Sequence, residues 1–253
     1  ILVAEDNDIN QKVIRHQLAK MGVACEIAEN GQEALRRWRG GKYALLLSDL
    51  HMPVMDGYAL AAAIRKEEPK GRHMPIIAFT ADISKGERDK CMAVGMDGYL
   101  TKPAPMERFR EMLNKWLPAV KNHVGPIESP AHVEGQMDVC APSVLDTAVL
   151  TGLVGDDPAL IDEFLADYLG TISKAAAEIQ VAFSEGDWRT VAFITHKLKS
   201  SSRSIGAMTL GDCCEKLENA GKVDDGNAVM ALMPEFNQLA SDVVNAIIHQ
   251  RSA

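Results

Sequence analysis

The sequence has no long hydrophobic run and no charged, signal-like start. Of its 253 residues 47% are hydrophobic, which is enough for one large domain or two ordinary ones. No uninterrupted apolar stretch approaches the roughly 18 residues of a membrane span. The chain opens on the strand-like segment ILVA at residues 1–4, without an initiator methionine. We therefore expect a cytoplasmic fragment with no membrane contact of its own, cut from a longer protein.

The sequence also lacks a CxxC motif, a concentrated region of positive charge and an ATP-binding motif. Its five cysteines are odd in number and include no CxxC pair, which favours reduced thiols and argues against a zinc site. Residues 1–118 carry a net charge of +2 and residues 119–253 one of −10. Contact with phosphates needs a concentrated basic face, so we expect no nucleic-acid binding. No GxxxxGK[ST] or glycine-rich ATP-lid pattern occurs, so ATP chemistry must come from elsewhere.

Short aliphatic runs alternate with amphipathic stretches in the first half of the chain. The runs occupy residues 1–4, 23–28, 44–49, 75–79 and 97–100. This alternation is typical of βα units whose parallel sheet is covered by helices on both faces. We therefore predict an α/β domain over residues 1–118, with a doubly wound, five-stranded parallel sheet.

The second half has a different pattern. Residues 119–142 contain scattered Pro, Gly and Ser without a sustained period, as in a linker. Strand signals then vanish, and four amphipathic helical patterns follow, divided by Gly186, Gly221 and Gly226. Short loops between such helices favour an antiparallel arrangement. We predict a separate all-α, four-helix-bundle domain over residues 143–253.

Polar residues follow nearly every predicted strand of the first half. They are Glu5, Asp6, Asp49, Thr80 and Lys102. Ligands of open parallel sheets bind outside the carboxyl ends of the strands, so these side chains should converge. Any one of them has a simpler interpretation, as a helix cap or a solvated charge. Three carboxylates in one crevice, however, would repel one another unless a hard cation such as Mg²⁺ lay between them.

Such a crevice would suit phosphoryl transfer. A free oxygen of Asp49 could attack a phosphorus atom whose charge is neutralised by Mg²⁺ on one side and by Lys102 on the other. The hydroxyl of Thr80 could bind a phosphoryl oxygen.

Four separately placed motifs in this half resemble those of response-regulator receiver domains. They are EDN (5–7), SDLHMPVMDG (48–57), TAD (80–82) and YLTKP (99–103). The resemblance implies a flavodoxin-like receiver domain in which Asp49 is phosphorylated and Thr80 and Tyr99 move as a switch. It also implies that Mg²⁺ is held by Asp6, Asp49 and the backbone carbonyl of His51.

Glu5 would complete the acidic group around that ion. The imidazole of His51 could tune dephosphorylation, or it could have no role beyond its backbone.

The stretch AFITHKLKSSSRSIGA, residues 192–207, contains a histidine on the polar side of a predicted helix. Its apolar neighbours gather on the other side: Val191, Ile194, Leu198 and Ile205. At 100° per residue His196 lies roughly 160° from them, so we expect it to face water. Cations such as Lys199 would disfavour protonation and keep Nε2 nucleophilic. Ala192 and Ser200 would leave room for another protein to close over the ring, although most water-facing histidines are only surface residues.

This stretch resembles the motif of histidine-containing phosphotransfer (HPt) domains. That motif is a His, a hydrophobic residue two positions later, a Lys three positions later, and then small residues. His196, Leu198 and Lys199 match it, although Ser200 stands where many members have Gly. The resemblance implies that His196 is phosphorylated and that Lys199 assists.

Together the two resemblances predict the C-terminal phosphotransfer part of a hybrid sensor histidine kinase, a transferase. A phosphoryl group would pass from a kinase histidine upstream in the same protein to Asp49, then to His196, then to the aspartate of a downstream response regulator. The full-length protein is expected to be anchored in an inner membrane.

Two alternatives remain open. In the first, the chain is an interaction module in which phosphorylation switches the receiver, the helical bundle is a dimerisation element, and His196 is incidental. In the second, it is a Mg²⁺-dependent phosphohydrolase with Asp49 as nucleophile. The second is favoured less, because His51 stands where a second acid/base aspartate would be expected.

Overall fold

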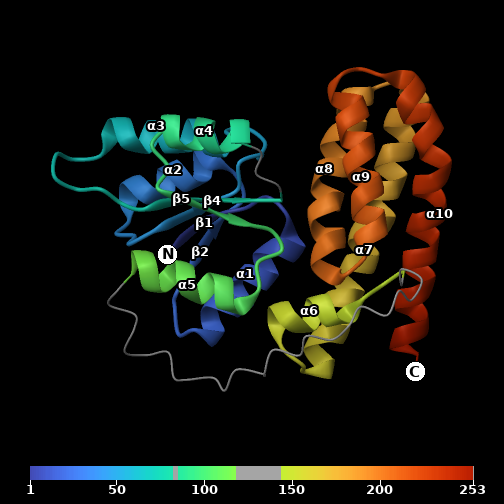
Figure 1. Cartoon of the computed structure of the whole chain (residues 1–253), viewed down its shortest axis with the longest axis horizontal. Helices are drawn as coiled ribbons and strands as arrows, with labels where there is room; N and C mark the ends of the chain where they lie inside the picture. The colour runs from blue at the N-terminus through green and yellow to red at the C-terminus, as the bar shows by residue number, and fades with distance from the viewer. Residues whose placement is uncertain (82–84, 118–143, 253) are drawn as a thin grey trace. The chain divides into compact units, whose positions relative to one another are not determined.

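The computed structural model describes residues 1–81, 85–117 and 144–252. The predicted linker at 119–142 and Asp82 of the TAD motif lie outside the described residues. The chain divides into two compact units, each of which is described by itself (Figure 1). Among the helices of the described ranges, none combines the length and the apolar content needed to cross a membrane.

The first unit alternates strands and helices: β1 (Leu2–Ala4), α1 (Asp8–Lys20), β2 (Glu26–Ala28), α2 (Gly31–Gly40), β3 (Leu46–Ser48), α3 (Gly57–Glu67), β4 (Ile76–Thr80), α4 (Lys85–Ala93), β5 (Gly98–Thr101) and α5 (Met106–Trp116). The strands pair in parallel in the order β2-β1-β3-β4-β5. The predicted doubly wound five-stranded sheet is therefore confirmed. β4 and β5 each end one residue later than the apolar runs that predicted them.

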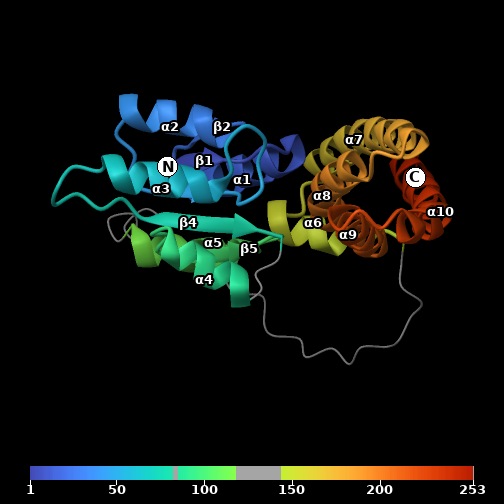
Figure 2. The ribbon, with the colours of Figure 1, turned by 90° about the horizontal axis from the view of Figure 1, so that it is seen from above.

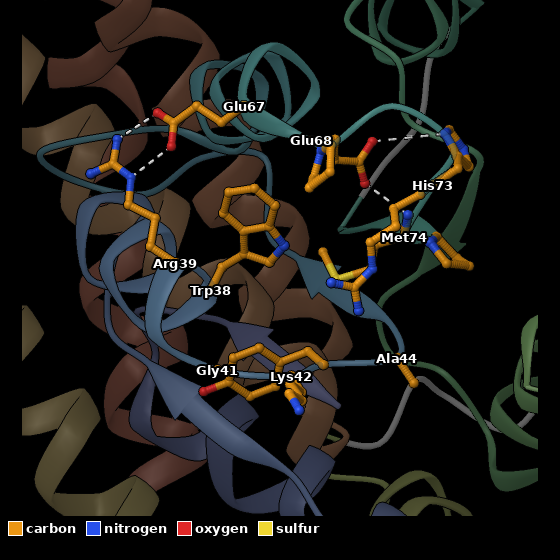
Figure 3. A pocket seen from close by; sticks show the side chains of 13 residues that line it. Trp38, Arg39, Gly41, Lys42, Ala44, Glu67, Glu68, His73 and Met74 are labelled. Carbon is orange, nitrogen blue, oxygen red and sulfur yellow. Dashed lines mark hydrogen bonds and ion pairs between the residues drawn. The ribbon is translucent and has the colours of Figure 1, made fainter.

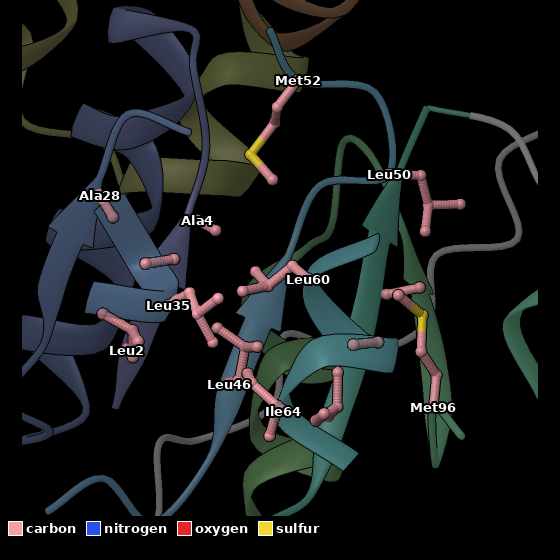
Figure 4. Packing of buried hydrophobic residues seen from close by; sticks show 14 of the residues in the cluster. Leu2, Ala4, Ala28, Leu35, Leu46, Leu50, Met52, Leu60, Ile64 and Met96 are labelled. Atoms are coloured by element: carbon pink, nitrogen blue, oxygen red, sulfur yellow. The ribbon is translucent and has the colours of Figure 1, made fainter. Parts of the chain in front are cut away.

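Side chains along the strands alternate between two apolar clusters, one on each face of the sheet. In β1, Leu2 and Ala4 join one cluster and Val3 joins the other. Helices α2, α3 and α4 cover the first cluster (Figure 4), whereas α1 and α5 lie on the other face of the sheet and cover the second (Figure 1). Because both faces are covered, the strands β1, β3 and β4 are buried along their whole length, whereas β2 and β5 at the edges of the sheet are partly exposed.

The second unit is all-helical: α6 (Thr147–Val154), α7 (Pro158–Glu185), α8 (Trp188–Ile205), α9 (Met208–Lys222) and α10 (Gly226–Arg251). Each of α7 to α10 packs against the next, and α10 returns to α7, which closes a four-helix bundle (Figure 2). The four predicted helices are confirmed. Helix α6, which packs on α7 and α8, was not predicted, because its eight residues carry no readable period.

Gly221 has a different role from the one predicted. It does not divide two helices but lies in the last turn of α9. A Cβ at this position would lie 2.3 Å from the backbone oxygen of Trp188 and 2.9 Å from Cβ of Ala192. Gly221 therefore lets α9 approach α8 more closely than any larger residue would allow.

Candidate functional site

Three carboxylates meet at the carboxyl ends of two neighbouring strands. Glu5 and Asp6 follow β1, and Asp49 follows β3, which pairs with β1. One carboxylate oxygen from each lies within 4.8 Å of the others. Glu5 and Asp49 are buried and Asp6 is partly buried. These hard oxygen donors in close proximity fit a Mg²⁺ ion.

Lys102 reaches into the same cluster. Its Nζ donates to Oε2 of Glu5 and to Oδ2 of Asp49, each at 2.5 Å. Burial by itself would lower the pKa of Lys102, but Asp49 and Glu5 outweigh burial and raise it, so the ammonium stays charged. Burial raises the pKa of Glu5 to about 7; Lys102 opposes this shift and Asp49 adds to it. The Lys102–Pro103 peptide bond is cis.

The loop after Asp49 is held by backbone contacts. The N–H of His51 donates to Oδ1 of Asp49 at 3.1 Å. At the start of α3, the N–H of Gly57 donates to the Leu50 oxygen at 3.0 Å. A Cβ on Gly57 would lie 2.2 Å from the Asp49 backbone oxygen, so glycine is required there. His51 is thus held next to Asp49, while the role of its carbonyl stays a prediction.

Thr80 lies at the edge of the sheet that carries the carboxylates, and Tyr99 lies on the surface. Thr80 ends β4 and is 2% exposed. The N–H of Lys102 donates to the Thr80 oxygen at 2.7 Å, which ties the ends of β4 and β5 together. Tyr99 in β5 is 42% exposed, with the guanidinium of Arg88 4.6 Å from its ring centroid. The structure therefore brings Thr80 and Lys102 to one edge and leaves Tyr99 on the outside.

The prediction that His196 faces water is wrong. Its side chain is only 16% exposed, and Nδ1 lies 2.8 Å from Oε1 of Glu218 in α9. Ala192 and Ser200 are buried. The small size of Ala192 serves the close approach of Gly221 in α9.

Glu218 is a buried carboxylate with three donors. Its side chain is 3% exposed and contacts Nδ1 of His196, Nζ of Lys199 at 2.8 Å and Nζ of Lys222 at 2.5 Å. Burial by itself would raise the pKa of Glu218, but the hydrogen bonds from His196, Lys199 and Lys222 outweigh it and hold this pKa well below its usual range. An ionised carboxylate can only accept, so Nδ1 is protonated toward Glu218, and in the neutral ring the lone pair lies on Nε2.

Lys199 has a different environment from the one predicted. Its side chain is 6% exposed and contacts Glu218 at 2.8 Å and Glu215 at 3.7 Å. The expected group of cations around His196 is therefore balanced by carboxylates of α9.

Glu218 and Lys222 were not among the residues predicted for the site. Both lie on α9, more than 20 residues from His196, and no short motif includes them. One signal was available for Glu218. It falls on the face of α9 that carries Cys214 and Gly221, four residues before it and three after it, so a charged residue was to be expected on a buried face.

A separate pocket lies at the opposite end of the receiver sheet, before β3 and β4 (Figure 3). It has a volume of about 530 Å³ and is lined in part by Trp38 and by the ion pair between Arg39 and Glu67. None of the predicted site residues lines it. The predicted site residues lie elsewhere. One group is at the carboxyl ends of the strands of the first unit, and the other is between α8 and α9 of the second.

Comparisons with known proteins bear on both units. Residues 1–114 match the family model of the response regulator receiver domain, and residues 163–246 match that of the Hpt domain. Hybrid signal transduction protein dokA of Dictyostelium discoideum is 44% identical over 122 residues, which are 48% of this chain and 7% of that protein.

Two further relatives align with both units. Virulence sensor protein BvgS of Bordetella pertussis is 29% identical over 230 residues, which are 89% of this chain and 18% of that protein. Sensor histidine kinase GacS of Pseudomonas protegens is 28% identical over 234 residues, which are 92% of this chain and 25% of that protein. The chain thus spans a quarter or less of the length of these relatives. Residues 1–114 therefore form a response regulator receiver domain and residues 163–246 an Hpt domain, so this chain joins these two domain families.

Proposed function

We propose that this chain relays a phosphoryl group through two of its own residues. A kinase histidine upstream in the same protein would supply the group to Asp49. His196 would accept it next and pass it to the aspartate of a separate response regulator. The observation that carries the proposal is the contact between Nδ1 of His196 and the ionised Glu218, because it leaves Nε2 as the nucleophile.

In the first step an oxygen of Asp49 forms a bond to phosphorus as the bond from phosphorus to the donor nitrogen breaks. Lys102, already 2.5 Å from Oδ2, offsets the negative charge of the new acyl phosphate. Thr80, at the end of β4 next to β3, would bind a phosphoryl oxygen. Mg²⁺ bound by Glu5, Asp6, Asp49 and the His51 carbonyl would neutralise charge between carboxylate and phosphoryl group.

In the second step Nε2 of His196 attacks the phosphorus of a phosphorylated aspartate. The bond from phosphorus to the carboxylate oxygen breaks, and the carboxylate leaves with its electron pair. In the neutral ring no proton has to leave the reacting nitrogen, because the ring proton lies on Nδ1. Positive charge that develops on the ring is stabilised by Glu218 at 2.8 Å. Both phosphorylated forms are reactive, so the same residues can run the step in reverse.

The test is to label the wild type, Asp49→Asn and His196→Gln with a small phosphodonor and Mg²⁺. We expect stable transfer onto histidine in the wild type, label on Asp49 alone in His196→Gln, and no acyl phosphate in Asp49→Asn. His196→Gln should also fail to deliver phosphate to a response regulator.

The alternatives give other results. Label that stays on Asp49 in the wild type would support an interaction switch and contradict the relay. Rapid turnover of many phosphate esters would support a hydrolase. Normal labelling of Asp49→Asn would show that the phosphorylation site is wrongly assigned.

We further propose that the receiver domain spans residues 1–118 and the phosphotransfer domain 143–253, joined by a linker at 119–142. Together they would be the cytoplasmic phosphotransfer part of a membrane-anchored sensor histidine kinase. Limited proteolysis should cut first within 119–142 and leave two protected fragments. Early cuts inside either domain would contradict these boundaries.

A further inference from the structure

We infer that Lys222 is a second cation of the His196 site, and that it exchanges Glu218 for the phosphoryl group when His196 is phosphorylated. This inference rests on the proposed function. It concerns a residue outside the motif around His196, on a different helix.

The geometry puts Lys222 within reach of the phosphoryl group. Oε1 of Glu218 contacts both Nδ1 of His196, at 2.8 Å, and Nζ of Lys222, at 2.5 Å. The two nitrogens can therefore be no farther apart than the sum of these distances. A phosphoryl group on Nε2 adds three oxygen atoms on the far side of a five-membered ring, which the four-carbon side chain of a lysine can approach by rotation.

Lys222 is better placed to move than Lys199. The side chain of Lys199 is 6% exposed and lies between Glu218 and Glu215. The side chain of Lys222 is 52% exposed and belongs to the last residue of α9. Lys199 can hold Oε2 of Glu218 in both states, whereas Lys222 can leave Oε1 with little loss of packing.

Phosphorylation changes which groups attract Lys222. As the N–P bond forms and the bond from phosphorus to the aspartate oxygen breaks, the ring of His196 gains positive charge and keeps its proton on Nδ1. That charge strengthens the hydrogen bond from Nδ1 to Oε1 of Glu218. It also weakens the hydrogen bond that Lys222 donates to the same oxygen. The phosphoryl group meanwhile brings a charge of about −1.5 to −2. A move of the Lys222 ammonium to a phosphoryl oxygen therefore improves both contacts.

The test compares Lys222→Gln with a matched control, Lys216→Gln, in the full chain. Both lysines lie on α9, are 52% and 58% exposed, and contact a single carboxylate each. We expect Lys222→Gln to lower the rate of phosphoryl transfer to His196, and the fraction of phosphohistidine at equilibrium, about three- to tenfold. Lys222→Arg should restore most of the loss, and Lys216→Gln should stay within about twofold of the wild type.

A second measurement distinguishes two roles of Lys222: binding the phosphoryl group, or only holding Glu218 in place. The ¹⁵N chemical shifts of the His196 ring, recorded without phosphodonor, should be the same in Lys222→Gln as in the wild type. A change of tautomer in that variant would mean that Lys222 acts by positioning Glu218, and would overturn the inference. Equal transfer in Lys222→Gln and Lys216→Gln would overturn it too, while the relay itself would stand. A wild type that never carries phosphate on His196 would overturn both.

Discussion

In the proposed relay Nε2 of the His196 imidazole reacts, while Nδ1 contacts a carboxylate. Glu218 determines which ring nitrogen is protonated toward it, because the carboxylate is ionised and can only accept a hydrogen bond. A histidine whose ring could turn or change tautomer would offer the wrong nitrogen part of the time. Hydrogen bonds from His196 itself, and then from Lys199 and Lys222, keep Glu218 ionised.

The low pKa of Glu218 predicts how the stability of the bundle depends on pH. In the folded state this pKa lies below the unfolded value of about 4.3. The carboxylate therefore contributes stability above that pH, and the contribution is lost as the pH falls further. Between pH 7 and pH 3 we expect the protonation of Glu218 to lower the free energy of unfolding of residues 144–252 by about 2 kcal/mol.

Urea denaturation at pH 7 and at pH 3 measures the effect, in the wild type and in Glu218→Gln. The glutamine has no charge to lose, so the variant should show a smaller decrease between the two pH values. Equal decreases in both proteins would contradict the prediction.

Lys102 should have opposite effects on Mg²⁺ and on phosphate. It contacts two of the three carboxylates that fit the ion, so Lys102→Met should bind Mg²⁺ at least about threefold more tightly. The same variant should phosphorylate Asp49 about tenfold or more slowly, because the charge of the new phosphoryl group is no longer offset. Titration with Mg²⁺ and labelling with a phosphodonor measure the two effects. Lys66→Met, which removes an exposed lysine of α3, is the control and should change neither.

Helices α8 and α9 are the element pair on which the proposed phosphotransfer site depends, because His196 belongs to one and Glu218 to the other. Their approach requires the absence of a side chain at Gly221. We expect Gly221→Ala to destabilise the bundle by about 2 kcal/mol, because the added methyl group overlaps the Trp188 oxygen. It should also slow transfer to His196, because α9 must move away with Glu218.

A matched control is Gly170→Ala. Gly170 lies in α7, and a Cβ there would meet nothing within 4 Å. Alanine should stabilise that helix by about 0.5–1 kcal/mol and leave transfer unchanged. Thermal melting and a transfer assay on both variants test the pair of predictions. Similar behaviour of the two alanines would show that the close approach at Gly221 is unimportant.

At the scale of the whole molecule, both proposed phosphorylation sites, Asp49 and His196, belong to one chain. Covalent connection can raise the effective concentration of one domain near the other to about the millimolar range. The net charges, +2 for residues 1–118 and −10 for 119–253, add little long-range attraction. We therefore expect transfer from Asp49 to His196 within single chains.

The measurement mixes Asp49→Asn chains with His196→Gln chains at low concentration and compares them with the wild type. The mixture should transfer more slowly, and the wild-type rate should not depend on its own concentration. A mixture as fast as the wild type, together with a wild-type rate proportional to concentration, would mean exchange between chains.

The sequence by itself determined the parallel sheet, the four long helices and the positions of Asp49, Lys102 and His196. Those features depend on local periodicity and on the rule that strand ends converge, both of which are readable along the chain. The tertiary structure alone decided the surroundings of His196. The helical period places a residue on one side of its own helix, but it does not say which other helix covers that side. Close packing of α9 turned an expected water-facing histidine into a partly buried one bonded to Glu218.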